Sequence, residues 1–197
     1  MSNEELKISP GVFVMEYDTN IHNIEFDPFV GVTVGLKRLR DSAVEPALGT
    51  QGAACFDLSA SFEPGMEIAG FNEYNEKFQQ GLTVDGEFVL YPGRRALIPT
   101  GWVFDIPVGF SMRIHPRSGI AWKNGVTLMN AEGVVDWDYT NETYVMLVNN
   151  SSSMFAIKNG DRIAQAEISI VFDTRFRQVS EISQKTDRIG GIGSTGV

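Results

Sequence analysis

The sequence predicts an all-β fold, a sandwich or barrel of short antiparallel strands. Turn signals recur about every eight residues along residues 88–119, at Pro92-Gly93, Thr100-Gly101 and Pro107-Val108-Gly109. The segments between them are short and rich in Val, Ile, Phe and Leu, and helical periodicity is weak throughout the chain. Short apolar runs with regular turn signals are typical of sandwiches and barrels.

The remaining elements follow from apolar runs bounded by polar or glycine residues. Further strands are expected at 30–39, 142–150, 154–160 and 162–172. The best helical candidate is a turn or two within 73–82.

The chain divides into one β domain with appendages. We expect an N-terminal extension at 1–31, a β domain at 32–186 with a polar insertion at about 64–86, and a C-terminal arm at 187–197. Four of the last eight residues are glycine, so the arm should be flexible until a ligand or partner orders it.

Composition narrows the class of protein. At 197 residues and 43% hydrophobic content the chain can bury a sizeable core. A net charge of -9 disfavours non-specific binding to nucleic acid or to an anionic membrane. No apolar run has the roughly 20 residues of a membrane span, and the N-terminus does not read as a signal peptide. A single cysteine excludes an intrachain disulfide and suits a reducing cytoplasm.

One acidic stretch calls for a functional explanation. In "GVVDWDYT", residues 133–140, Asp136 and Asp138 stand two apart. In an extended chain they would share a face, which is costly on a buried strand. These carboxylates are therefore candidates for chemistry.

The positions of the cysteine and the two histidines give little support for covalent catalysis or for a transition-metal site. Cys55 lies in an apolar run and reads as a small core residue. His22 and His115 are far apart and match no metal spacing, and His115 reads as structural. An enzyme with this sequence would use carboxylates, water, a divalent cation and hydrogen-bond donors.

Several segments offer such donors. Arg117 and Ser118 lie between a proline and a glycine, where a guanidinium and a hydroxyl can reach a ligand. Residues 160–165 read as a turn and a strand, and 190–196 have the glycines and hydroxyls of a phosphate cradle. Taken singly, each segment is better explained by a plain feature: a turn, an ordinary strand residue and a disordered tail.

Together these segments resemble the trimeric all-β dUTPase family, whose five motifs occur here in order. The motifs are "AACFDLSA" (53–60), "PRSGIA" (116–121), "NAEGVVDWDY" (130–139), "GDRIAQ" (160–165) and "GGIGSTG" (190–196). The resemblance covers roughly residues 32–197. It implies a distorted jelly-roll fold, a homotrimer with shared active sites, and Mg²⁺-dependent hydrolysis of dUTP to dUMP and pyrophosphate.

The resemblance assigns roles to the third motif. It implies Asp136 as the general base that activates the attacking water. Tyr139 would pack under the deoxyribose and exclude a 2′-hydroxyl. Asn130 would bind the uracil edge, helped by the backbone of Gly133 and Val135. Asp138 would stiffen the turn or hold a second water.

The other motifs would hold the triphosphate. The implied ligands are Arg117, Ser118, Gly119, Gln165 and, in the arm, Arg188, Ile192, Gly193, Ser194 and Thr195. Mg²⁺ would be bound mainly by phosphates and water, with Asp57 either touching it through water or purely structural.

The match departs from the family in the arm. Ile192 stands where the family has an aromatic ring over the uracil, and Arg188 is one residue closer to the glycine pair than expected. Cys55 replaces a glycine, and Asn141 replaces another that it can mimic in left-handed backbone.

Three alternatives remain open at this level. A dCTP deaminase or dCTP/dUTP hydrolase shares the fold, but a deaminase usually carries R-S-S-x-A-R where this chain has "RSGIAW". A non-catalytic nucleotide-binding regulator would suit the altered fifth motif. A β-sandwich without ligand would leave five polar motifs unexplained.

Overall fold

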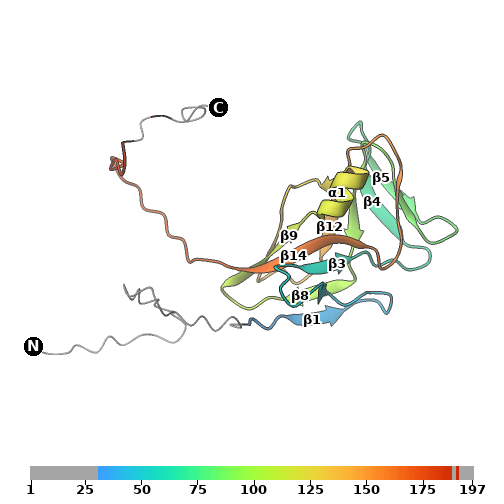
Figure 1. The fold of residues 1–197 in the computed structure, drawn as a ribbon, viewed down its shortest axis with the longest axis horizontal. Helices are drawn as coiled ribbons and strands as arrows, with labels where there is room; N and C mark the ends of the chain where they lie inside the picture. The colour runs from blue at the N-terminus through green and yellow to red at the C-terminus, as the bar shows by residue number, and fades with distance from the viewer. Residues whose placement is uncertain (1–30, 188–189, 191–197) are drawn as a thin grey trace, which may run out of the picture. The chain divides into compact units, whose positions relative to one another are not determined.

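The computed structural model describes residues 31–187 and residue 190, and these form an all-β domain with one short helix (Figure 1). The strands are β1 (Gly35–Arg38), β2 (Ala47–Leu48), β3 (Phe56–Ser59), β4 (Glu67–Phe71), β5 (Lys77–Gly81), β6 (Phe88–Leu90), β7 (Arg95–Pro99), β8 (Trp102–Asp105), β9 (Phe110–His115), β10 (Val126–Leu128), β11 (Gly133–Asp136), β12 (Tyr144–Asn149), β13 (Phe155–Ile157) and β14 (Arg162–Ile170). The helix α1 spans Ser118–Asn124. The predicted fold class is confirmed.

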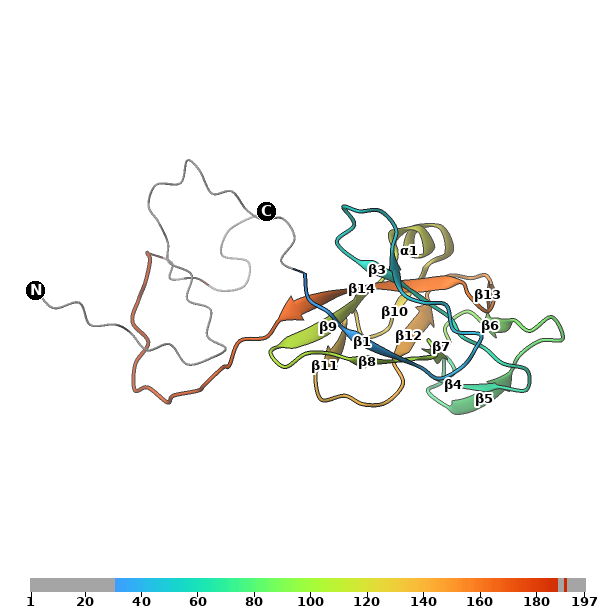
Figure 2. The same ribbon diagram turned by 90° about the horizontal axis from the view of Figure 1, so that it is seen from below.

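Two five-stranded antiparallel sheets enclose the core. Their strand orders are β10-β12-β7-β4-β5 and β11-β9-β14-β3-β2, and the pairs β1-β8 and β13-β6 complete the domain (Figure 2). A single buried cluster draws side chains from both sheets, including Leu58 and Met112 of one and Ile98 and Leu147 of the other. Burial of this apolar surface is the main stabilising contribution.

Glycines form the turns that the sequence predicted. Gly93, Gly101 and Gly109 have φ values of +74°, +79° and +86°, a region that L-residues with a Cβ avoid. At Gly101 space is also lacking, because an added Cβ would lie 2.5 Å from the Ala43 Cβ and 2.7 Å from the Ser61 Oγ. Both requirements explain a glycine at this position.

The segment at 64–86 forms a hairpin at the edge of one sheet. It contains β4 and β5, so the helical turn expected within 73–82 is wrong. Burial alternates along β5, with Phe78 facing inward between exposed Lys77 and Gln79, which is the period of a strand. The Asn72 side chain closes the turn by accepting hydrogen bonds from the backbone N–H of residues 74 and 76.

The helix α1 was not anticipated from the sequence. Its start at Ser118 follows the extended residue Arg117, and Gly125 ends it in left-handed backbone with φ +67°. Among residues 31–187 and 190, no helix is long and apolar enough to cross a membrane.

Candidate active site

Residues of three predicted motifs lie side by side on one sheet. β14 runs between β3 and β9, and Gln165 is in register with both Asp57 and His115. This pairing brings the first, second and fourth motifs together, although they are far apart in the sequence.

Two arginines hold the Asp57 carboxylate. Its Oδ1 lies 3.0 Å from Arg117 Nε, and its Oδ2 accepts a 2.9 Å hydrogen bond from Arg162 Nη1. Arg117 also donates to the backbone oxygen of Arg162 at 2.9 Å, and Gln165 Nε2 donates to the backbone oxygen of Pro116 at 3.0 Å. One carboxylate between two guanidinium groups leaves a net positive charge, which suits an anionic ligand. We call Asp57, Arg117, Arg162 and Gln165 the arginine cluster.

Ser118 and Gly119 adjoin the arginine cluster. Both are exposed in the first turn of α1, directly after Arg117. The predicted phosphate ligands of the second and fourth motifs thus gather at one place, around Asp57.

The third motif occupies the edge strand β11 and the turn after it. Gly133 is buried against β9, where an added Cβ would lie 3.0 Å from the Ile114 Cβ, and Val135 is half-buried. Asp136 ends the strand, and its backbone oxygen accepts a 3.1 Å hydrogen bond from the N–H of Tyr139. Asp138 lies in this turn, so the two aspartates do not share a strand as the extended pattern suggested.

Asp136 is available for chemistry. It is exposed, and among the residues that the structure describes its carboxylate has no hydrogen-bond or ion-pair partner. Asn130 is exposed at the other end of the segment, where its backbone oxygen accepts from the N–H of Glu132 at 2.6 Å.

The turn that carries Tyr139 is anchored to the domain. The Tyr139 hydroxyl donates to the backbone oxygen of Glu142 at 3.0 Å. The Glu142 side chain pairs with Arg40 and accepts a 2.8 Å hydrogen bond from the N–H of Gly101. Burial, and then the negative charge of Glu142, raise the pKa of Tyr144. The contacts of Glu142 with Tyr139, Arg40 and Gly101 therefore hold the turn of Tyr139 in place.

Asp136 lies far from the arginine cluster within one chain. On β9 Asp136 pairs with Ser111, whereas Gln165 pairs with His115. Four residues of strand separate these positions, a rise of about 13 Å. One chain therefore does not bring the candidate base against its own predicted phosphate ligands.

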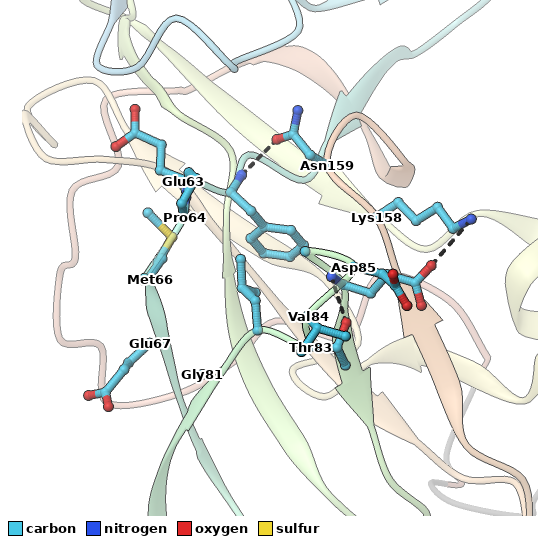
Figure 3. A pocket seen from close by; sticks show the side chains of 15 residues that line it. Glu63, Pro64, Met66, Glu67, Gly81, Thr83, Val84, Asp85, Lys158 and Asn159 are labelled. Atoms are coloured by element: carbon cyan, nitrogen blue, oxygen red, sulfur yellow. Dashed lines mark hydrogen bonds and ion pairs between the residues drawn. The ribbon is translucent and has the colours of Figure 1, made fainter.

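A cleft of about 1070 Å³ opens elsewhere, and it contains none of the predicted nucleotide ligands (Figure 3). It lies between residues 62–67, residues 81–87 and the loop at 158–159. Lys158 Nζ pairs with Glu87 Oε1 at 3.2 Å, and Asn159 Oδ1 accepts from the N–H of Phe62 at 2.7 Å.

The predicted ligands of the arm are not described by the structure. Arg188, Ile192, Gly193, Ser194 and Thr195 all lie outside residues 31–187 and 190. Their roles stay predictions.

Sequence reasoning missed one group of side chains. Cys55 is only partly buried, and its thiol lies near His115 and Glu167. Burial, and then the charge of Glu167, raise the pKa of Cys55. No spacing rule finds this group, because strand pairing alone assembles it.

The fold and the arginine cluster define the class: an all-β protein with a positively charged cluster that suits an anionic ligand. Comparison with known proteins identifies the family. A family model described as dUTPase matches residues 81–196. The chain is 41% identical over 152 residues to the deoxyuridine 5′-triphosphate nucleotidohydrolase of Rhizobium rhizogenes, covering 77% of this chain and 85% of that protein. Against the enzyme of the same name from Brucella melitensis, identity is 38% over 151 residues, covering 77% and 83%.

Solved structures agree on the fold. A dUTPase of Staphylococcus bacteriophage 80alpha bound to dUpNHpp matches with a TM-score of 0.63 at 20% identity, covering 84% of this chain and 99% of that one. The dUTPase of phage phi11 of S. aureus, described with a structural Mg(II) ion, matches at 0.58 and 19%, covering 76% and 98%.

The chain belongs to the dUTPase family. Its reaction is the hydrolysis of dUTP to dUMP and pyrophosphate.

Proposed function

We propose that this chain hydrolyses dUTP by in-line attack of a water molecule on the α-phosphorus, with Asp136 as the general base. The exposed Asp136 carboxylate has no partner among residues 31–187 and 190, so it is free to hold and deprotonate water. The Cys55 thiol is a poor nucleophile at neutral pH, because burial and Glu167 raise its pKa. A carboxylate-activated water is the route that these groups favour.

We further propose that the chain works as a homotrimer with shared active sites. The observation that carries this is the separation of Asp136 from the arginine cluster, four strand residues apart on β9. A neighbouring subunit would supply Arg117, Ser118, Gly119 and Gln165 to the nucleotide held by the third motif. Exposed apolar side chains such as Val134 and Trp137 beside Asp136 suit a subunit contact.

Base and sugar selection would reside in the third motif. Asn130 and the backbone of Gly133 and Val135 would bind the uracil edge. Unmatched donors would reject cytosine. Tyr139, held through its hydroxyl by the Glu142 backbone, would pack under the deoxyribose and leave no room for a 2′-hydroxyl.

Mg²⁺ would be held mainly by the triphosphate and by water, where it neutralises the phosphate charge. Asp57 Oδ1 forms an ion pair with Arg117 and Oδ2 accepts a hydrogen bond from Arg162, so both oxygens keep a lone pair for a water molecule. This donor chemistry fits a hydrated Mg²⁺, which prefers oxygen ligands and retains its waters. Arg117 and Gln165 would orient the phosphates, with Ser118 donating its hydroxyl.

The arm would close the site. Residues 171–187 contain no helix or strand, and Phe172 and Phe176 are 81% and 96% exposed, as in a segment that docks on another subunit. Arg188, Gly193, Ser194 and Thr195 would then cover the triphosphate, and Ile192 the uracil.

The location proposed for the enzyme is the cytoplasm, since a single cysteine agrees with a reducing compartment.

Subunit complementation tests the shared site. Asp136→Asn and Arg117→Ala chains are each purified, then unfolded together and refolded as a mixture. If base and phosphate ligands come from different subunits, about a quarter of the sites in a random trimer carry both intact residues. Activity should recover to about that fraction of wild type.

A matched pair controls for non-specific recovery. Asp136→Asn mixed with Asn130→Ala should stay inactive, because both residues belong to the same segment of one chain. Recovery in neither mixture would overturn the shared site, while dUTP hydrolysis by the wild-type protein tests the reaction separately.

A further inference from the structure

Three side chains of different chemistry converge beside the arginine cluster. A Cys55 sulfur, a His115 nitrogen and a Glu167 oxygen all lie within 4.8 Å of one another. The pairing explains why. Glu167 stands two residues from Gln165 on one face of β14, and Gln165 pairs with His115 on β9. Phe56 pairs with Ala166, so Cys55, one residue before Phe56, comes opposite Glu167.

The orientation of His115 supplies a second observation. Its Nε2 lies 3.5 Å from Glu167 Oε1, and its Nδ1 lies 3.8 Å from Glu132 Oε1. The other Glu132 oxygen accepts from Arg113 at 3.2 Å. A metal-bound histidine almost always directs its second ring nitrogen to a carboxylate or carbonyl. One nitrogen of His115 thus faces a possible co-ligand, and the other faces a carboxylate that is itself held in place.

We propose that Cys55, His115 and Glu167 bind a divalent transition ion of the zinc type, with Glu132 orienting the imidazole through Nδ1. Ligand atoms about 2.0–2.3 Å from a tetrahedral zinc lie about 3.3–3.8 Å apart, which the His115–Glu167 distance already satisfies. The Cys55 sulfur lies within 4.8 Å of both ligand atoms, and the side chain is only partly buried. The fourth position is left for water or another ligand.

Charge and ligand type favour this class of ion. A thiolate and a carboxylate neutralise a divalent cation, while Glu132 stays paired with Arg113. Thiolate and imidazole ligands suit Zn²⁺ and Co²⁺, whereas Mg²⁺ demands oxygen. The site therefore differs from the one proposed for the substrate's Mg²⁺.

The position gives the ion a structural task. Cys55, His115 and Glu167 each stand two residues along the chain from Asp57, Arg117 and Gln165 respectively. A bound ion would cross-link β9, β14 and the residue before β3, immediately next to the residues proposed to hold phosphate. It would stiffen the arginine cluster without touching the nucleotide.

Co²⁺ absorption tests the proposal, because this chain has a single cysteine. The full-length protein is stripped with chelator and titrated with Co²⁺. We expect about one ion per chain, with a thiolate-to-cobalt charge-transfer band in the near ultraviolet. Zn²⁺ should abolish the band by displacing Co²⁺, and should protect Cys55 from alkylation, whereas Mg²⁺ should do neither.

Variants identify the ligands. Cys55→Ser should remove the band, and His115→Gln and Glu167→Gln should each weaken Co²⁺ binding at least tenfold. Glu132→Gln should weaken it about 10–100-fold. His22→Gln and Glu87→Gln are the matched controls and should leave binding unchanged.

Two results would overturn the proposal. One is absence of the band at stoichiometric Co²⁺, which would leave His115 lying between the Glu132 and Glu167 carboxylates without a metal ion. The other is a band that survives both His115→Gln and Glu167→Gln, which would mean binding by the thiol alone.

Discussion

Replacing Asp136 by Asn should separate catalysis from folding. The side chain is exposed and loses no hydrogen bond or ion pair within residues 31–187 and 190, so the free energy of unfolding should change by less than about 0.5 kcal/mol. A general base contributes about 10²–10⁴-fold to rate, which is about 3–5 kcal/mol of transition-state stabilisation. The expected result is a loss of kcat of that size with little change in stability.

Asp138→Asn is the matched control. It makes the same change of charge and shape two residues away, at another exposed aspartate without a recorded side-chain partner in the described part of the chain. We expect its kcat to stay within a factor of about ten of wild type, because a positioned general base accounts for at least 10²-fold.

The assay is pyrophosphate release from dUTP with Mg²⁺, at saturating substrate, alongside thermal unfolding at one protein concentration. Binding of the analogue dUpNHpp, measured by calorimetry, shows whether the nucleotide site is intact. Near-full turnover by Asp136→Asn, or equal losses in both variants, would refute the assignment of the base.

Three further changes test the fold and the ligand site. Gly101→Ala should lower the free energy of unfolding, measured by urea denaturation, by about 3 kcal/mol. The added Cβ would clash with Ala43 and Ser61, and the backbone there is left-handed. A loss below about 1 kcal/mol would contradict that packing. Asp57→Asn should lower the free energy of unfolding by about 1–2 kcal/mol, because it weakens the ion pairs with Arg117, which is 26% exposed, and Arg162, which is 57% exposed. It should also raise KM for dUTP. An unchanged thermal midpoint would argue against the two ion pairs. Ile192→Phe should tighten dUpNHpp binding about fivefold, or about 1 kcal/mol, by adding an aromatic contact to the uracil, and unchanged affinity would remove that contact from the account.

The sequence alone determined the class of fold and the reaction. Turn geometry is local, so glycines such as Gly93 and Gly109 mark strand ends whatever the rest of the chain does. The five short motifs in their fixed order identified the family, because each motif must supply side chains of a defined kind. The strands β12 and β14 were likewise readable from apolar runs.

Tertiary structure decided which residues meet. Arg162 is separated by 105 positions from Asp57 and by 45 from Arg117, and only strand pairing joins the three. Strand pairing between β4 and β5 also made the polar segment around Phe78 a hairpin. The pairing of β14 with β3 and β9 brought Cys55, which reads from its neighbours as a core residue, up against His115. Cross-strand register depends on contacts throughout the sheet, and no local pattern of side chains contains it.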